Sequence, residues 1–174
     1  MSRQLTHYTT DFEEKKFPLV LICDGVSSPA NIGSLFRLAD AFNIEKLILC
    51  GKQLNLNSAR LQKTARGTFE KVPFEQQEDI LQVCEKYKNE GYTLFSLEIT
   101  DDSVSLESMD FSQFGRVALI LGNEVLGIQQ QALDQSDNSL HIRMFGRNSS
   151  MNVAQSAGIA LYEITKSLQP LQYL

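Results

Sequence analysis

Runs of mostly apolar residues recur along the chain, and most of them end in glycine, proline or small polar residues. Continuous apolar character is typical of strands that are covered on both faces. The predicted strands are residues 17–24, 46–50, 92–99, 117–121 and 140–144. A weaker strand is expected at residues 69–74, where Pro73 interrupts the pattern.

Between these strands the apolar residues follow helical spacing. Ile32, Leu35 and Phe36 come after Asn31 at helical intervals, so we expect a helix that Asn31 caps. Further helices are predicted at residues 57–64, 78–90 and 129–134, and after Asn152. Residues 101–110 are acidic and predict a surface loop. This alternation predicts an α/β fold, a mainly parallel sheet with helices on both faces.

The composition fits one globular domain, because 43% of the 174 residues are hydrophobic. We expect a polar N-terminal extension at residues 1–16 and a single domain at residues 17–174. The extension lacks the apolar core of a secretory signal, and no run of about 18 apolar residues could span a bilayer. A cytoplasmic protein without membrane contact is therefore expected. Cys23, Cys50 and Cys84 lack metal or redox spacing and are expected in the core.

The basic residues gather in one part of an acidic chain. The net charge of -5 and the pI of about 5.1 argue mildly against a general nucleic-acid binder. One stretch nevertheless combines a single acidic residue, Glu70, with five basic ones: Lys52, Arg60, Lys63, Arg66 and Lys71. From charge alone, ordinary solvated side chains are the favoured interpretation of this stretch. A local positive patch that binds a polyanion remains the alternative.

Several common catalytic motifs are absent from the sequence. His7 and His141 are the only histidines, which leaves little for a His-rich metal site, and we expect no metal. There is no GxSxG elbow, no GxxxxGK[ST] phosphate loop and no GxGxxG fingerprint. His141 lies in a predicted strand and is expected to be structural.

Polar residues instead follow the ends of predicted strands, and parallel strands bind ligands at their carboxyl ends. Arg37 comes four residues after Gly33, where the missing side chain would leave room beside the arginine. This arrangement suits a phosphate or a carboxylate, with an ordinary exposed arginine as an equal alternative. Gly122 would let a ligand approach the backbone, and Glu124 could face that ligand or cap the next helix.

The turn before the last predicted helix holds more polar residues than one helix start needs. Ser149, Ser150 and Asn152 can each accept a hydrogen bond from a free helix N–H, and Arg147 adds a cation. The surplus suggests a bound ligand, although polar loop residues are more often simply solvated. Small residues such as Ala157 in the following helix permit close packing within the subunit, the default expectation, or across a dimer.

Together these segments resemble the three motifs of the SpoU (TrmH-like) RNA ribose methyltransferases of the SPOUT superfamily. The first motif is SSPANIGSLFRLADAF, with Pro29, Asn31, Gly33 and Arg37. The second is LILGNEVLGI, and the third is IRMFGRNSSMNVAQSAGIALYE, with Ser150, Asn152 and Val153. The resemblance spans roughly residues 17–166, and three ordered motifs are far more specific than one. Arg143 stands where the family often has proline, and Met151 where leucine is common.

By resemblance, the sheet is expected to carry a C-terminal trefoil knot whose loops hold S-adenosylmethionine. The residues that would contact this cofactor are Leu97, Leu121, Gly122, Ile142, Ser150 and Met151. The resemblance also implies a homodimer with an active site completed across the interface.

The resemblance associates Arg37 with activation of a ribose 2′-hydroxyl. It assigns supporting roles to Asn31, Glu124, Ser150 and Asn152. A guanidinium keeps its proton and is a poor general base, so we hypothesise that Arg37 binds the adjacent phosphate and stabilises the developing alkoxide. The candidate RNA contacts, mostly to phosphates, are Arg60, Lys63, Arg66 and Arg147.

The expected function is S-adenosylmethionine-dependent methyl transfer to a ribose 2′-hydroxyl of RNA. We expect tRNA rather than rRNA, by analogy with compact TrmH-like proteins. The alternatives are an rRNA 2′-O-methyltransferase, a non-catalytic RNA-binding protein on the same scaffold, and an unrelated nucleotide-binding α/β domain. The presence of all the supporting residues together with Arg37 speaks against a non-catalytic protein.

Overall fold

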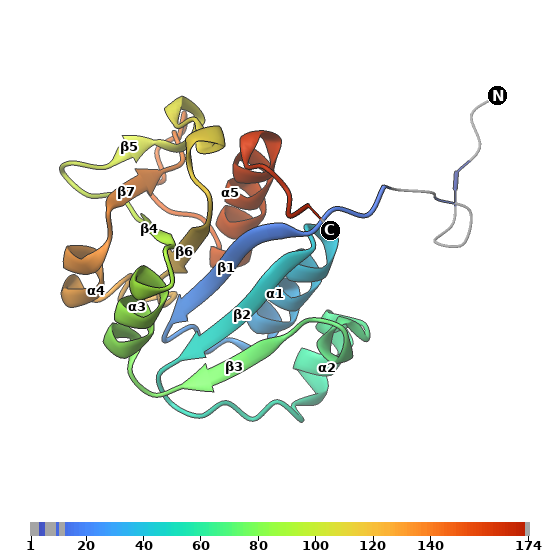
Figure 1. Ribbon diagram of the computed structural model, residues 1–174. Helices are drawn as coiled ribbons and strands as arrows, with labels where there is room; N and C mark the ends of the chain where they lie inside the picture. The colour runs from blue at the N-terminus through green and yellow to red at the C-terminus, as the bar shows by residue number, and fades with distance from the viewer. Residues whose placement is uncertain (1–3, 6–9, 11–12, 173–174) are drawn as a thin grey trace.

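A single parallel sheet forms the centre of the molecule (Figure 1). The computed structural model describes residues 4–5, 10 and 13–172, and within them the sheet has 7 strands. The strands are β1 (Phe17–Asp24), β2 (Ile44–Cys50), β3 (Phe74–Gln77), β4 (Thr93–Leu97), β5 (Val104–Ser105), β6 (Val117–Leu121) and β7 (Asn138–His141). Their order is β3-β2-β1-β6-β4-β7-β5, and every neighbouring pair is parallel. The predicted parallel α/β fold is confirmed, and the trefoil knot stays a prediction.

Helices cover both faces of this sheet (Figure 1). They are α1 (Pro29–Ala41), α2 (Ala59–Ala65), α3 (Ile80–Asn89), α4 (Gln130–Gln135) and α5 (Val153–Ser167). Leu21 and Leu119 pack on the α1 and α5 side, whereas Ile22 and Ile120 pack on the α3 and α4 side. Successive residues of a strand point to opposite faces, which explains why β1 and β6 are apolar throughout. None of the helices in the described residues is long and apolar enough to cross a membrane.

The structure corrects the prediction of a strand at residues 69–74. Thr68–Glu70 is a short 3-10 turn, η2, and β3 begins only at Phe74. Pro73 has no N–H to pair, but its carbonyl accepts a hydrogen bond from the Leu47 N–H at 3.0 Å. The apolar pattern there reflects aromatic packing instead, because the Phe69 ring lies 4.9 Å from the Phe74 ring, centroid to centroid.

The predicted bounds of β2, β4 and β7 and the predicted loop at residues 101–110 also differ from the structure. β7 begins at Asn138 and ends at His141, whereas we expected residues 140–144. Asn138 pairs with Phe95 of β4 through the backbone, which does not require an apolar side chain. Residues 101–110, predicted as a surface loop, contain β5 and a second 3-10 turn, η3 (Leu106–Ser108), in which Leu106 is buried. A third 3-10 turn, η4 (Phe111–Gln113), follows.

The start of α1 also differs from the prediction. Pro29 is the first helical residue and Ser28 the N-cap residue, so Asn31 lies inside the first turn and does not cap the helix. Proline suits that first position because its N–H would be unpaired there anyway. Gly33 is buried, and a Cβ there would lie 2.7 Å from the Thr64 Cβ. The missing side chain at Gly33 therefore lets α2 pack closely against α1. The prediction of open space beside Arg37 was wrong.

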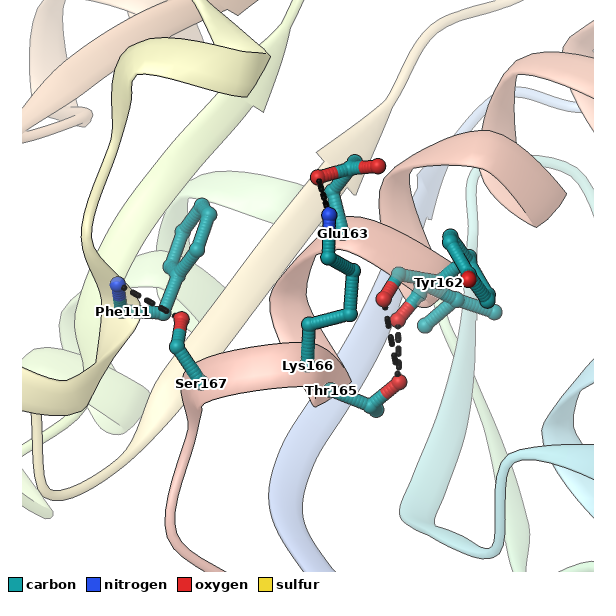
Figure 2. A network of polar contacts seen from close by, with 7 residues as sticks. Phe111, Tyr162, Glu163, Thr165, Lys166 and Ser167 are labelled. Atoms are coloured by element: carbon teal, nitrogen blue, oxygen red, sulfur yellow. Dashed lines mark hydrogen bonds and ion pairs between the residues drawn. The ribbon is translucent and has the colours of Figure 1, made fainter.

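The C-terminal end of α5 is anchored on one side and exposed on the other (Figure 2). The Ser167 hydroxyl accepts a hydrogen bond from the backbone N–H of buried Phe111 at 3.1 Å. On the opposite side, Tyr162 is 59% exposed, next to an ion pair between Lys166 and Glu163 at 2.9 Å. The outer face of α5 thus leaves an aromatic side chain uncovered within the described chain.

The cysteines are buried free thiols, as predicted. Burial raises the pKa of Cys84 to about 11 and that of Cys50 to about 12, and it also raises the pKa of Cys23. A thiol needs to ionise to react, so these side chains serve packing.

Candidate active site

A pocket of about 520 Å³ lies at the carboxyl ends of β4, β6 and β7. This is where ligands bind in open parallel sheets, and the volume falls within the range of small-molecule sites. All six residues predicted to contact a cofactor line it: Leu97, Leu121, Gly122, Ile142, Ser150 and Met151. The structure therefore brings together residues from three separate parts of the chain.

A tight hairpin, residues 123–127, forms one wall of this pocket. Asn123 and Gly127 exchange two backbone hydrogen bonds of 3.0 Å each. The Asn123 side chain accepts hydrogen bonds from the N–H groups of Val125 and Leu126, and it donates one to the Gly25 carbonyl at 2.6 Å. Sequence reasoning gave Asn123 no role, although an asparagine at the start of a turn is a recognisable signal for such bonds.

Gly122 is required by the backbone of this hairpin. A Cβ at Gly122 would lie 2.4 Å from the carbonyl carbon of Gly127 and 2.6 Å from the nitrogen of Ile128. We expected the missing side chain to admit a ligand. On the side where a Cβ would project, the chain itself fills the space, so the glycine lets the hairpin close against β6.

Three polar side chains from different motifs form hydrogen bonds beside the pocket. The Glu124 carboxylate accepts a hydrogen bond from the Asn31 amide at 2.9 Å. The Asn31 carbonyl oxygen in turn accepts one from the Asn152 amide, also at 2.9 Å. We call Asn31, Glu124 and Asn152 the polar cluster. It joins residues 93 and 121 positions apart in the sequence, which local patterns do not predict.

Glu124 also binds the start of α1. Its two carboxylate oxygens accept hydrogen bonds from the N–H groups of Ser28 at 3.1 Å and Ser27 at 3.3 Å. A carboxylate there offsets the positive end of the helix dipole. Partial burial raises the pKa of Glu124, but the bonds from Asn31, its own N–H, Ser28 and Ser27 outweigh burial and hold the pKa below its usual value. Glu124 therefore stays ionised and is a weak proton acceptor.

Asn152, one of the three residues that could cap α5, is its N-cap residue. Its side-chain oxygen accepts hydrogen bonds from the N–H groups of Ala154 at 2.9 Å and Gln155 at 3.3 Å. Ser149 and Ser150 line the pocket but form no hydrogen bond with the described residues. One residue thus does the capping, and the two serines stay available to a ligand.

Arg37 lies apart from the pocket. It is exposed, and it forms no hydrogen bond or ion pair within the described part of the chain. It comes six residues after Asn31 on α1, and six residues turn a helix by about 600°, so the two side chains leave different faces. A single copy of the chain does not bring Arg37 to the wall of the pocket.

The candidate RNA-binding cations fall into two groups. Arg60, Lys63 and Arg66 are exposed on or just after α2, which packs against α1. Arg147 is exposed on the segment between β7 and α5. The cations therefore come from two separate segments of the chain.

The pocket has the chemistry that S-adenosylmethionine requires. Its described lining includes two carboxylates, Glu98 and Glu124, and contains neither lysine nor arginine. Apolar side chains such as Leu121 and Ile142 could contact a flat adenine ring. A ligand with an apolar ring and a positively charged sulfonium group fits this lining.

The sequence model of the SpoU rRNA Methylase family matches residues 18–162. The chain belongs to this family. An uncharacterized tRNA/rRNA methyltransferase of Borreliella burgdorferi is 27% identical over 92% of the chain and 69% of that protein. The 23S rRNA (guanosine-2′-O-)-methyltransferase RlmB of Pseudomonas aeruginosa is 28% identical over 89% of the chain and 61% of that protein. The chain thus spans about 60–70% of the length of these SpoU relatives.

Solved structures agree with the SpoU assignment. The SpoU methyltransferase AviRb of Streptomyces viridochromogenes, in complex with the cofactor AdoMet, is 26% identical with a TM-score of 0.74 over 88% of this chain and 61% of that chain. A structure described as giving insights into the 2-OH methylation of C/U34 on tRNA is 26% identical with a TM-score of 0.76. It is matched over 86% of this chain and 95% of that chain.

Proposed function

We propose that the chain transfers a methyl group from S-adenosylmethionine to a ribose 2′-hydroxyl of RNA. The observation that carries this proposal is the polar cluster beside a pocket suited to a cationic cofactor. The family assignment and the 2′-O-methyltransferase name of the Pseudomonas aeruginosa relative support it. A non-catalytic RNA-binding role would leave no chemical need for a pocket and cluster of this kind.

When bound, S-adenosylmethionine supplies an electrophilic methyl group on a sulfonium. Glu124 lines the pocket as an ionised carboxylate, and the hydrogen bonds from Asn31 and the α1 backbone hold it in place. Asn152 and Asn31 orient each other, so the cluster is arranged before substrate binds. Ser150 keeps a free hydroxyl for the ribose.

Arg37 binds the phosphate next to the reacting ribose and stabilises the alkoxide that develops on the 2′-oxygen as the hydroxyl proton passes to solvent water. A guanidinium can contact a phosphate through two parallel N–H groups, which fixes the nucleotide in one orientation. The exposed and unpaired state of Arg37 supports this role, because the side chain has no protein partner to lose.

The active unit in this proposal is a homodimer, in which Arg37 of one copy serves the pocket of the other. Arg37 lies off the pocket wall, so a single copy lacks the phosphate contact. α5 has an uncovered apolar face, with Ile159 40% exposed and Tyr162 59% exposed. Near the pocket, Val125 and Phe145 are 88% and 90% exposed. Exposed apolar side chains of this size are typical of an interface.

The proposed RNA is a tRNA. The structure described for methylation of tRNA is matched over 95% of its length, whereas RlmB, named for rRNA, is matched over 61%. Arg60, Lys63 and Arg66 would contact phosphates from the α2 side, and Arg147 from the loop beside the pocket. A cytoplasmic location is part of the same proposal, because that is where tRNA is abundant.

The direct test is incubation of the protein with labelled S-adenosylmethionine and total small RNA, followed by nuclease mapping. A nuclease-resistant 2′-O-methyl dinucleotide is the expected product. Methyl transfer to a base would overturn the reaction class. Cofactor binding without transfer to tRNA or rRNA would favour the non-catalytic alternative.

The dimer is tested with two inactive variants, Arg37→Ala and Glu124→Ala, combined in one heterodimer by co-expression with different tags. If Arg37 acts across the interface, one of the two pockets is intact, and the heterodimer recovers about half of the wild-type rate. If Arg37 acts within its own copy, both pockets are defective and no activity returns. Arg37→Ala homodimers provide the baseline.

A further inference from the structure

A second carboxylate in the pocket, Glu98, has an open oxygen. Glu98 directly follows β4, and its backbone N–H donates to the Leu140 carbonyl at 2.9 Å, which fixes it between β4 and β7. One side-chain oxygen accepts a hydrogen bond from the Ile99 N–H at 3.0 Å. The other, Oε2, has no hydrogen-bond partner among the described residues. This oxygen is therefore available to a ligand.

The open oxygen lies close to the backbone of Gly127. A Cβ at Gly127 would lie 2.8 Å from Glu98 Oε2, so the carboxylate rests against the bare backbone of the hairpin. Gly127 also has a positive φ of 69°, which favours glycine. The hairpin thus leaves space for the carboxylate on the pocket wall.

The two pocket carboxylates lie on opposite flanks of the hairpin. β6 lies between β1 and β4 in the sheet, and the hairpin continues β6. Glu124 reaches the β1 side, where Ser28 and Asn31 use its oxygens. Glu98 comes from the β4 side. A cofactor whose methyl group faces the polar cluster therefore directs another part of itself toward Glu98.

We propose that Glu98 binds the ribose hydroxyls of S-adenosylmethionine. This proposal rests on the proposed function, because it concerns the same pocket. A carboxylate accepts hydrogen bonds from hydroxyl groups, and acidic residues near the strand ends of parallel sheets bind nucleotide riboses in this way. Leu97, which precedes Glu98 and also lines the pocket, is apolar and suits the adjoining adenine. The sulfonium end is left to the polar cluster, where methyl transfer takes place.

This assignment is tested with methylthioadenosine, which carries adenine and ribose but neither a sulfonium nor an amino-acid group. Calorimetry on the full chain compares wild type with Glu98→Gln, and methylthioadenosine with its 2′-deoxy analogue. Glu98→Gln should weaken binding of methylthioadenosine and of S-adenosylmethionine by about tenfold each, since charge-assisted bonds are lost. Binding of the 2′-deoxy analogue should change much less. Glu85→Gln, on the exposed side of α3, is the matched control.

Three results would overturn the assignment. The first is unchanged affinity of Glu98→Gln for methylthioadenosine. The second is weaker binding of S-adenosylmethionine alone, because Glu98 would then face a positive charge rather than the ribose. The third is an equal loss for the ribose and 2′-deoxy ligands. If wild-type protein bound neither S-adenosylmethionine nor methylthioadenosine, the proposed function would fail together with this inference. Thermal unfolding of Glu98→Gln and of Glu98→Asp separates a binding defect from a folding defect.

Discussion

The candidate site has two regions that are built differently. Asn31, Glu124 and Asn152 form a polar cluster in which each side chain is held by another, with distances of 2.9 Å. Arg37 and Arg147 are exposed and have no hydrogen-bond partner in the described part of the chain. The fold holds the side chains of the polar cluster in place, whereas Arg37 and Arg147 become ordered only when they bind a ligand.

The two regions therefore suit different functions. A preorganised cluster needs no reordering when charge develops in the reaction, so it suits the reacting atoms. Long flexible cations lose side-chain entropy only on binding, which suits a large and variable polyanion such as RNA. Substitutions in the cluster should therefore affect stability and turnover together, and substitutions of the free cations should change RNA binding or turnover while the stability of the fold stays the same.

The largest effect is expected from Arg37→Lys. Turnover should fall by about 100-fold, because a lysine cannot make the paired contacts of a guanidinium to a phosphate. Cofactor affinity and melting temperature should not change, since Arg37 has no protein partner to lose. Single-turnover methyl transfer and calorimetry measure these quantities, with Arg116→Lys as a control at the other end of the sheet. Nearly full turnover with unchanged RNA affinity would remove the phosphate role from Arg37.

The next effect concerns the other free cations. Replacing Arg60, Lys63 and Arg66 with glutamine should weaken RNA binding and reduce the slope of log affinity against log salt by about 2, at about 0.7 per phosphate contact. Arg147→Gln alone should reduce it by about 0.7. Lys86 and Lys88 on α3 serve as control positions. An unchanged slope in the triple variant would exclude α2 from the RNA surface.

A smaller effect is expected from substitutions of Asn152, which caps α5 and also donates a hydrogen bond to Asn31. Asn152→Ala should lower the free energy of unfolding by about 1 kcal/mol, because the N-cap of α5 is lost. Asn152→Ser keeps a capping oxygen but cannot reach Asn31 with an amide, so stability should largely return while turnover stays low. Urea unfolding and methyl-transfer rates give the comparison. If both variants were fully active, Asn152 would be a cap and nothing more.

The smallest effect is the pH dependence of Glu124. Because its pKa in the folded state lies below the usual value, the ionised carboxylate stabilises the fold above about pH 4.3, and this contribution is lost as pH falls through the folded-state pKa. Wild type should be more stable than Glu124→Gln by at most about 1 kcal/mol at pH 7, given the solvent exposure of the carboxylate. Thermal melts from pH 7 to pH 2 should show this difference shrink. A difference that stayed constant would mean that the charge of Glu124 does not contribute.

The sequence predicted the parts of the fold that depend on local patterns. β1 and β6 were predicted with their observed bounds, since apolar runs covered on both faces are unambiguous. The strand expected at residues 69–74 was wrong because Phe69 belongs to an aromatic cluster, a tertiary contact that mimics the strand pattern. The buried Leu106 was missed because its neighbours are acidic.

Local sequence patterns predicted less of the candidate site than of the fold. Spacing placed Asn31 as a helix cap, and only the family resemblance associated it with Glu124 and Asn152, which lie 93 and 121 residues away. We predicted space for a ligand beside Gly33, but α2 occupies that space. The sequence of one helix does not show how closely a second helix packs against it. Glu98 was missed altogether, since a single acidic residue after a strand carries no distinctive signal.

The buried thiols have a practical consequence for labelling experiments. The pKa is about 11 for Cys84 and about 12 for Cys50, and that of Cys23 is also raised. The native cysteines should therefore not react with maleimide dyes near neutral pH. A cysteine introduced at Ile99, which lines the pocket and is 55% exposed, would then carry a single fluorophore without removal of the native ones. Such a probe would report the arrival of the cofactor as an optical signal.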